Sequence, residues 1–183
     1  MKPTLTRTAL LISALLLSPL AAQAAAPTKA EYAAAKTTIS ANYKATKDAC
    51  DSLKANAKDI CEEEAKATEK NARAELEFRA SGKPADGTRV QIVKADGIYE
   101  VAKERCDDLS GNAKDVCNKE AKAAHVAAIA AAKSPNASAE SRAEAKEDVN
   151  EAKYKAAAEK CDTLTGDAKT ACIQAAKTAH GQR

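Results

Sequence analysis

Residues 106–117 read CDDLSGNAKDVC, and two close variants of this stretch recur in the chain. The first variant is CDSLKANAKDIC at residues 50–61, and the second is CDTLTGDAKTAC at residues 161–172. Successive copies start 56 and 55 residues apart, and a fixed period of this length indicates a repeat architecture. All six cysteines lie in the three copies. The sequence therefore predicts three structural units, each with its own pair of cysteines.

Helix-forming residues surround every copy. Ala, Lys and Glu dominate the flanks, and all three have strong helix propensity. The one β-branched cluster, Val90, Ile92 and Val93, is short and continues into a helical pattern, so we predict helix there as well. The chain is therefore predicted to be all-α, with each copy forming two antiparallel helices joined by a tight turn.

The turns carry consistent sequence signals. Gly111 and Gly166 suit a residue with left-handed backbone at the end of the first helix, whereas Ala55 stands at this position in the first copy. Polar residues that follow suit the N-cap of the second helix. The predicted N-caps are Asn56, Asn112 and Asp167.

The cysteines bracket each turn almost symmetrically. Cys106 lies five residues before Gly111 and Cys117 six after it, so in an antiparallel hairpin the two face each other. Each lies about 8 Å from the turn, and neighbouring helix axes 8–10 Å apart allow a disulfide. A loop of this size contributes about 3 kcal/mol. The predicted pairs are Cys50–Cys61, Cys106–Cys117 and Cys161–Cys172.

Three other uses of the cysteines stay open at this point: pairing between copies, thiol redox chemistry and metal binding. Redox activity lacks the C-x-x-C motif that lowers a thiol pKa at the start of a helix. A zinc site needs four close ligands, which this spacing does not gather. Structural disulfides within each hairpin are the favoured interpretation.

Repeated apolar positions predict which helix face points inward. In each copy, the residues seven before and three after the first cysteine share one face of the first helix. On the second helix, the residues four and seven after the second cysteine form a seam of small side chains. The first set comprises Tyr43, Tyr99, Tyr154, Leu53, Leu109 and Leu164. The second comprises Ala65, Ala121, Ala176, Thr68, Ala124 and Ala179. Bulky apolar residues are few, with one Phe and no Trp, so the predicted core is thin.

Composition shifts divide the chain. Turn formers at residues 81–88 and 134–138 mark two linkers, and Thr28 with Glu31 forms a capping-box pattern at the first helix. The predicted segments are a signal peptide at 1–24, hairpin repeats at 25–80, 89–133 and 139–183, and the two linkers. The last repeat is predicted to have a truncated second helix.

The N-terminus matches an export signal. Lys2 and Arg7 precede a short apolar run, Ala9–Leu17, and a small-x-small cleavage site follows at Ala24. No cysteine lies at this site, so a lipid anchor has no attachment point. An exported chain with an even number of cysteines is typical of an oxidising compartment, so we expect a periplasmic protein with disulfides.

Charge and motifs exclude several function classes. Basic and acidic residues nearly balance at 29 and 26, which argues against a nucleic-acid binder. Membrane-surface binding is disfavoured because bulky apolar residues are scarce. No catalytic motif is present, so we expect no enzyme, no cofactor and no small-molecule substrate.

Some polar residues recur at equivalent repeat positions. His125 and His180 lie eight residues after the second cysteine, where Glu69 stands in the first copy, and we expect solvent-facing histidines rather than metal ligands. An aspartate follows each first cysteine and a lysine lies in each turn. These are Asp51, Asp107, Asp162, Lys58, Lys114 and Lys169. A Lys–Asp pair across the turn is the favoured interpretation, and a repeated ligand-binding tip is the functional alternative.

The motif C-D-x-L-[SAT]-[GA]-[ND]-A-K-[DT]-x-C, followed by an E-A-K-A type helix, resembles exported proteins of Gram-negative bacteria that are often labelled TolA-like or cell-envelope proteins. Cys106–Ala123 carries it, with weaker matches at Cys50–Ala67 and Cys161–Ala176. The LTGDAK of the third copy is also similar to a periplasmic phosphate-starvation repeat family, in which the cysteines lie farther apart. Neither resemblance implies a catalytic site.

The function predicted from sequence is a non-enzymatic structural, stress-related or protein-interaction role in the cell envelope, with an envelope protein as partner. A thiol-disulfide or metal-handling protein is the alternative from another class, and lipid-surface binding is a third.

Overall fold

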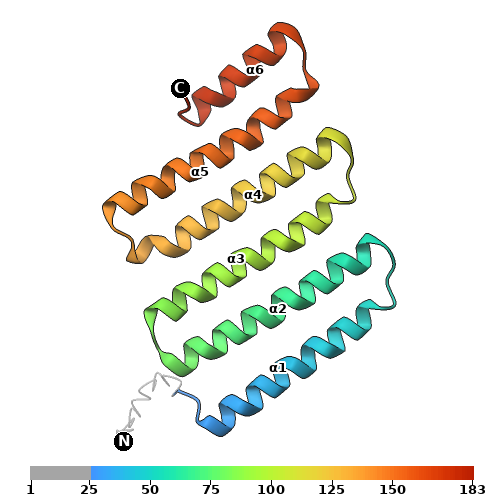
Figure 1. Cartoon of the computed structure of the whole chain (residues 1–183), viewed down its shortest axis with the longest axis vertical. Helices are drawn as coiled ribbons and strands as arrows, with labels where there is room; N and C mark the ends of the chain where they lie inside the picture. Colours follow the sequence, from blue (N-terminus) through green and yellow to red (C-terminus); the bar gives the residue numbers. More distant parts are fainter. Residues whose placement is uncertain (1–25) are drawn as a thin grey trace, which may run out of the picture.

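The computed structural model describes residues 26–183 (Figure 1). The predicted signal peptide and its cleavage site at Ala24 lie outside this range. Helix is the only regular secondary structure of residues 26–183, so the all-α prediction is confirmed. Val90, Ile92 and Val93 lie in a helix, as predicted.

Residues 26–183 form six α-helices that lie side by side in one layer, with neighbours antiparallel (Figure 1). Each packs against its neighbours in sequence, so the three hairpins form an elongated array and not a closed bundle. The helices are α1 (Lys29–Cys50), α2 (Asn56–Ser81), α3 (Pro84–Cys106), α4 (Gly111–Lys133), α5 (Ala139–Glu159) and α6 (Gly166–Ala179). Short 3₁₀ turns η1 (Ser134–Asn136) and η2 (Lys160–Thr163) follow α4 and α5. As predicted, α6 is short, with 14 residues against 26 in α2.

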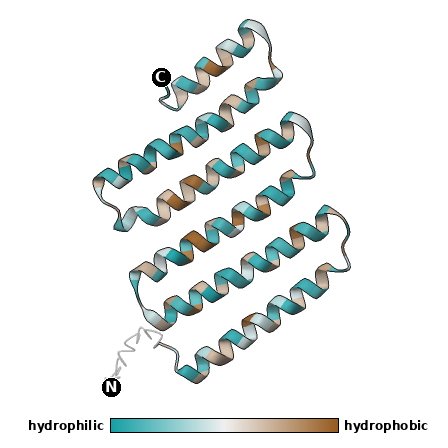
Figure 2. Ribbon diagram, viewed as in Figure 1, coloured by the Kyte–Doolittle hydropathy of each residue, from teal (hydrophilic) through white to brown (hydrophobic). Residues whose placement is uncertain are grey.

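The interior is as thin as the composition predicts. A single layer leaves both broad faces open, and Figure 2 shows hydrophilic residues along every helix with only scattered hydrophobic ones. Most of the buried side chains are alanine or cysteine, and none is polar among residues 26–183. The buried set is Cys50, Ala65, Ala74, Leu76, Val90, Ala95, Cys106, Ala123, Ala156, Cys161 and Ala176.

Local sequence signals set the ends of several helices. The predicted capping box forms at α1: Thr28 N–H donates to Glu31 Oε2 at 2.8 Å, and Glu31 N–H donates to Thr28 Oγ1 at 3.3 Å. The Thr28 contacts also lower the pKa of Glu31, through the backbone hydrogen bond first. The second break is confirmed near residues 134–138, where η1 precedes α5 and Ser138 caps that helix.

The first break is narrower than predicted. Only Gly82 and Lys83 separate α2 from α3, because Gly82 ends α2 with a φ of +64° and Pro84 fits the first turn of α3. Gly87, read from sequence as a turn former, lies inside α3 beneath the ring of Phe78. A Cβ at Gly87 would lie 3.2 Å from that ring.

The predicted N-caps are wrong in detail. Helices α4 and α6 begin at Gly111 and Gly166, and no N-cap side chain bonds to either helix end. Both glycines have positive φ, as predicted, but they start the second helix of their hairpin rather than end the first. Asn56 is the first residue of α2, and its side chain donates to the carbonyl of Glu104 at 2.7 Å. That bond joins the first hairpin to the second.

Gly97 allows a close approach between two hairpins. A Cβ built on Gly97 in α3 would lie 2.7 Å from the Cβ of Ala67 in α2, closer than real side chains come. From sequence, this glycine predicts only a weaker helix, whereas the structure gives it a packing role.

An ion pair also recurs between hairpins. Arg105 contacts Glu64 at 2.7 Å across α3 and α2, and Lys160 contacts Glu120 at 2.6 Å between η2 and α4. The four residues occupy equivalent repeat positions. The two junctions between hairpins therefore share this ion pair.

The predicted seam of small residues is half correct. Ala65 and Ala176 are buried and Ala121 is half-buried, but the residues seven after the second cysteine, Thr68, Ala124 and Ala179, are exposed. In a single layer each helix meets only one neighbour on each side, so the wider inward stripe of a bundle has nothing to pack against. Within residues 26–183, no helix combines the length and apolarity needed to cross a membrane.

Candidate functional site

The three turns that carry the repeated motif lie along one edge of the array (Figure 1). Each is closed by the predicted disulfide, and the Cα atoms of the three pairs lie 5.7, 5.6 and 5.8 Å apart. The first cysteine of each pair, at residues 50, 106 and 161, is fully buried. No described cysteine is free.

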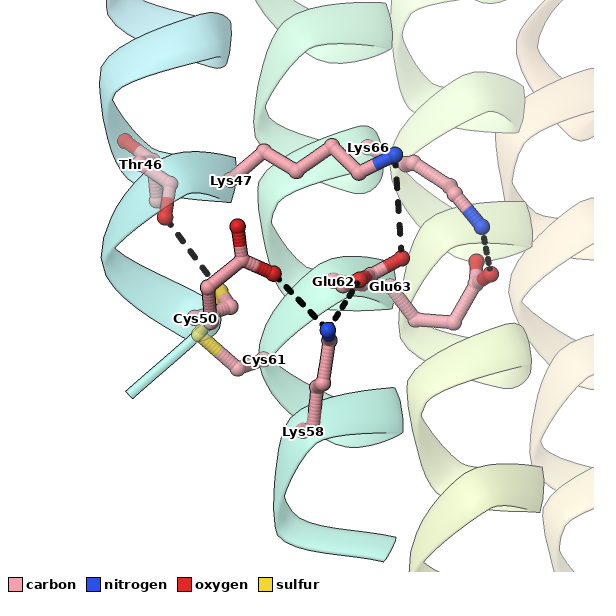
Figure 3. A network of polar contacts seen from close by, with 9 residues as sticks. Thr46, Lys47, Cys50, Lys58, Cys61, Glu62, Glu63 and Lys66 are labelled. Carbon is pink, nitrogen blue, oxygen red and sulfur yellow. Dashed lines mark hydrogen bonds and ion pairs between the residues drawn. A yellow bond between two sulfur atoms is a disulfide. The ribbon is translucent and has the colours of Figure 1, made fainter. Parts of the chain in front are cut away.

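The predicted Lys–Asp pair forms across every turn. Lys58 Nζ lies 2.7 Å from Asp51 Oδ1. It also lies 3.9 Å from Glu62 Oε1, and Figure 3 shows Lys58 and Glu62 beside the Cys50–Cys61 disulfide. The equivalent distances are 3.0 Å for Lys114–Asp107 and 2.9 Å for Lys169–Asp162. Each turn therefore presents one aspartate and one lysine in the same arrangement.

This pair affects ionisation in the first turn. The hydrogen bond from Lys58, and then its positive charge, lowers the pKa of Asp51, and the same contact raises the pKa of Lys58. Both groups face solvent, so salt screens the interaction and it adds little to stability.

The leucines of the turns are not in the interior. Leu53, Leu109 and Leu164 were predicted to share the inward face with the tyrosines, yet they are 40%, 43% and 38% exposed. Each lies beyond the last residue of the first helix, where the 3.6-residue period no longer applies. The prediction of the inward face is correct within the helices, because its tyrosines are half-buried: Tyr43, Tyr99 and Tyr154. The repeated turn therefore displays an apolar side chain beside its Asp–Lys pair.

His125 does not face solvent, contrary to the sequence interpretation. Its side chain is only 15% exposed, and its ring stacks on Tyr99 with centroids 4.7 Å apart. His125 Nε2 lies 2.6 Å from Asp96 Oδ1, so with an ionised Asp96 the Nε2–H donates, while Nδ1 is buried without a hydrogen-bond partner. The sequence contains one signal for this contact. Tyr99 was predicted to lie on the inward face of its helix, which is the face that packs against the helix of His125.

The equivalent position in the first hairpin has other chemistry. Glu69 pairs with Arg73 at 2.7 Å, and Arg73 reaches Ser40 at 2.9 Å. Ser40 occupies the repeat position of Asp96, so a bridging arginine replaces the direct His–Asp contact. His180 follows the last residue of α6, in a different hairpin from His125. The two histidines are not brought together.

Polar side chains of residues 26–183 also group together outside the three turns. Among residues 26–183, no set of three or more His, Cys, Asp or Glu side chains is placed to hold a metal ion. A shallow groove between α2 and α3 is lined by interspersed charges, including Lys66, Arg73, Glu77 and Arg89. The pairs across it, such as Arg89–Glu77 at 2.7 Å, are ordinary surface ion pairs.

The tips of the three disulfide-closed turns are therefore the strongest candidate site, as a surface repeated along one edge of the array. The chain matches no family model, and the comparisons with curated proteins and with solved structures found no similar chain.

Proposed function

We propose that this is a non-enzymatic protein of the periplasm that acts through protein contacts in the cell envelope. The observation that carries the proposal is the row of three disulfide-closed turns on one edge of the array. The tip of each turn has an exposed leucine beside an Asp–Lys pair. Single exposed leucines are common on protein surfaces. Here the leucine recurs in every turn at the same position, on a backbone that a disulfide holds.

Rigid display favours binding. A disulfide closes each turn, so a partner that contacts the tip does not have to order a flexible loop first. Three tips on one chain also permit multivalent contact with an elongated or repeated partner, which raises the overall affinity. The three disulfides support an oxidising compartment, and the predicted signal peptide supports export to the periplasm.

In-cell photo-crosslinking tests the proposal. A photoreactive amino acid replaces Leu109 in one variant and Lys94, an exposed residue of α3 away from the turns, in the matched control. We expect Leu109 to give a discrete crosslinked product with another envelope protein, and Lys94 to give none or a different one. Circular dichroism checks that both variants keep their helix content.

Two results would contradict the proposal. One is the same product, or none, from both positions. The other is turnover of a substrate by the purified protein in a broad hydrolase and oxidoreductase screen. A thiol titration under native and denaturing conditions addresses the thiol-disulfide alternative, which requires cysteines that are readily reduced.

A further inference from the structure

Within residues 26–183, each end helix of the array lacks one of the two neighbours that cover the equivalent helices inside it. The second helix of one hairpin packs on the first helix of the next, at α2–α3 and at α4–α5. By the repeat, α6 is equivalent to α2 and α4, and α1 is equivalent to α3 and α5. Within residues 26–183, nothing packs against the outer side of α1 or of α6 (Figure 1).

The outer side of α1 has the small residues that a close helix contact needs. Ala34, Ala41 and Ala45 are exposed there, at the positions of Val90, Gly97 and Val101 in α3. Gly97 leaves room for the close approach of Ala67 in α2, and Val90 is buried. The exposed alanines of α1 therefore lie where an interface forms one repeat later.

The outer side of α6 matches it. Ala171 and Ala175 are exposed there, at the positions of Val116 and Glu120 in α4. Terminal units of repeat proteins usually present a polar outer surface that prevents further stacking. Ala41 and Ala175 depart from that rule at the positions of Gly97 and Glu64, whereas Thr178 at the position of Ala67 and Asn42 at the position of Ile98 are small polar residues.

The repeated ion pair gives the second argument. Glu64–Arg105 and Glu120–Lys160 join the internal junctions, but the equivalent residues of the two ends are Ala175 and Ala49. Both partners of the pair are missing together. Neither outer side carries a charge at this position, so a contact between α6 and α1 would create no unpaired charge there.

We infer that the chain associates head to tail, with the outer side of α6 in one copy packing against the outer side of α1 in the next. This inference rests on the proposed function as an interaction protein and names one partner, a second copy of the chain. The contact joins two different surfaces, so it can add copies along the axis of the array and form an open row. Because α6 has only 14 residues, the interface is small and the association weak.

Sedimentation velocity of the oxidised full chain tests the inference, over concentrations from about 1 µM to about 1 mM, which span weak affinities. We expect the average mass to rise with concentration. Ala41→Glu places bulk and charge at the position equivalent to Gly97 and should shift the association to concentrations at least tenfold higher. Ala33→Glu is the matched control, because Ala33 is also exposed on α1 but points about a quarter-turn away.

Rebuilding the missing ion pair provides the gain-of-function arm. The double variant Ala49→Arg/Ala175→Glu should tighten association about two- to fivefold, as expected for an exposed pair, and salt should remove the gain. The like-charged variant Ala49→Arg/Ala175→Arg should weaken association. Positions 49 and 175 belong to the first and last hairpins, at opposite ends of the array, so the difference cannot arise within one copy (Figure 1).

A chain that stays monomeric throughout this range overturns the inference. So does association that Ala41→Glu leaves intact, or that Ala33→Glu weakens equally. If the chain is monomeric while Leu109 still crosslinks to an envelope protein, the inference fails and the proposed function stands. If copies associate head to tail but Leu109 gives no specific product, the proposed function fails instead.

Discussion

Helices within a hairpin and helices of neighbouring hairpins are held together in different ways. Within hairpins, a disulfide fixes the turn end of each pair with Cα atoms within 5.8 Å. Between α2 and α3 no covalent bond exists, and the contact depends on the fit of Gly97 against Ala67 and on the ion pair Arg105–Glu64. The covalent bond recurs in every hairpin, whereas at the second junction Ala152 stands at the position of Gly97 and only the ion pair recurs.

The side chains inside the hairpins agree with this difference. At one repeat position, the first hairpin has Glu69–Arg73–Ser40 and the second has the direct contact His125–Asp96. The disulfide keeps the two helices of a hairpin adjacent, so either set of side chains can occupy this position. The ion pair between hairpins, in contrast, recurs with the same charges at both junctions.

Removing a clip should have the largest effect. In Cys106→Ser/Cys117→Ser, the loss of loop constraint is expected to lower the free energy of unfolding by about 3 kcal/mol. Urea denaturation measures the change, and hydrogen exchange should show faster exchange in α3 and α4 than in α1. The paired control is the same double change at Cys161 and Cys172, where only the short α6 should open. A loss below about 1 kcal/mol at residues 106 and 117 would mean that packing alone holds the hairpin.

A change at the unclipped junction should come second. Gly97→Val puts a branched side chain where even a Cβ would lie 2.7 Å from that of Ala67, and the overpacking is expected to cost about 2 kcal/mol. The milder Gly97→Ala should be partly rescued by Ala67→Gly, which returns the space. Thermal unfolding of the single and double variants measures both effects. Equal stability of Gly97→Val and the native chain would contradict the close approach.

These two contact types also explain what the sequence could predict. The clips are local: cysteines 11 residues apart around a turn specify a hairpin without knowledge of the rest of the fold. The three disulfides and the Asp–Lys pairs were predicted correctly for this reason, since each follows from spacing along one short segment. The all-α class was predicted correctly from the helix-forming Ala, Lys and Glu of the flanks.

The junctions and the exposed tips depend on longer-range geometry. No local pattern distinguishes a single layer of helices from a bundle, so the role of Gly97 and the exposure of Thr68 could not be predicted. Leu109 was misplaced because the helical period was extended past Cys106, where α3 ends. His125 was misplaced because its partner Asp96 lies 29 residues away on another helix.

A smaller effect is expected from the turn of the first hairpin. Ala55 has a φ of +50°, where Gly111 and Gly166 have +55° and +56° at the equivalent positions. A side chain is strained in this region, so Ala55→Gly should raise the free energy of unfolding by about 0.5–1 kcal/mol. Gly111→Ala should lower it by a similar or larger amount. Opposite shifts in melting temperature are expected, and a decrease for Ala55→Gly would argue against the turn conformation.

The smallest expected effect concerns ionisation at the first clip. The contact with Lys58 lowers the pKa of Asp51, so this carboxylate stabilises the fold above its ordinary pKa near 3.8. That contribution is lost as the pH falls through the lower pKa of the folded state. Titration of the Asp51 carboxyl carbon by NMR measures the shift directly, and Lys58→Met should return the pKa toward its ordinary value. An unchanged Asp51 pKa in Lys58→Met would show that the ion pair does not persist in solution, and that the disulfide alone orders the tip.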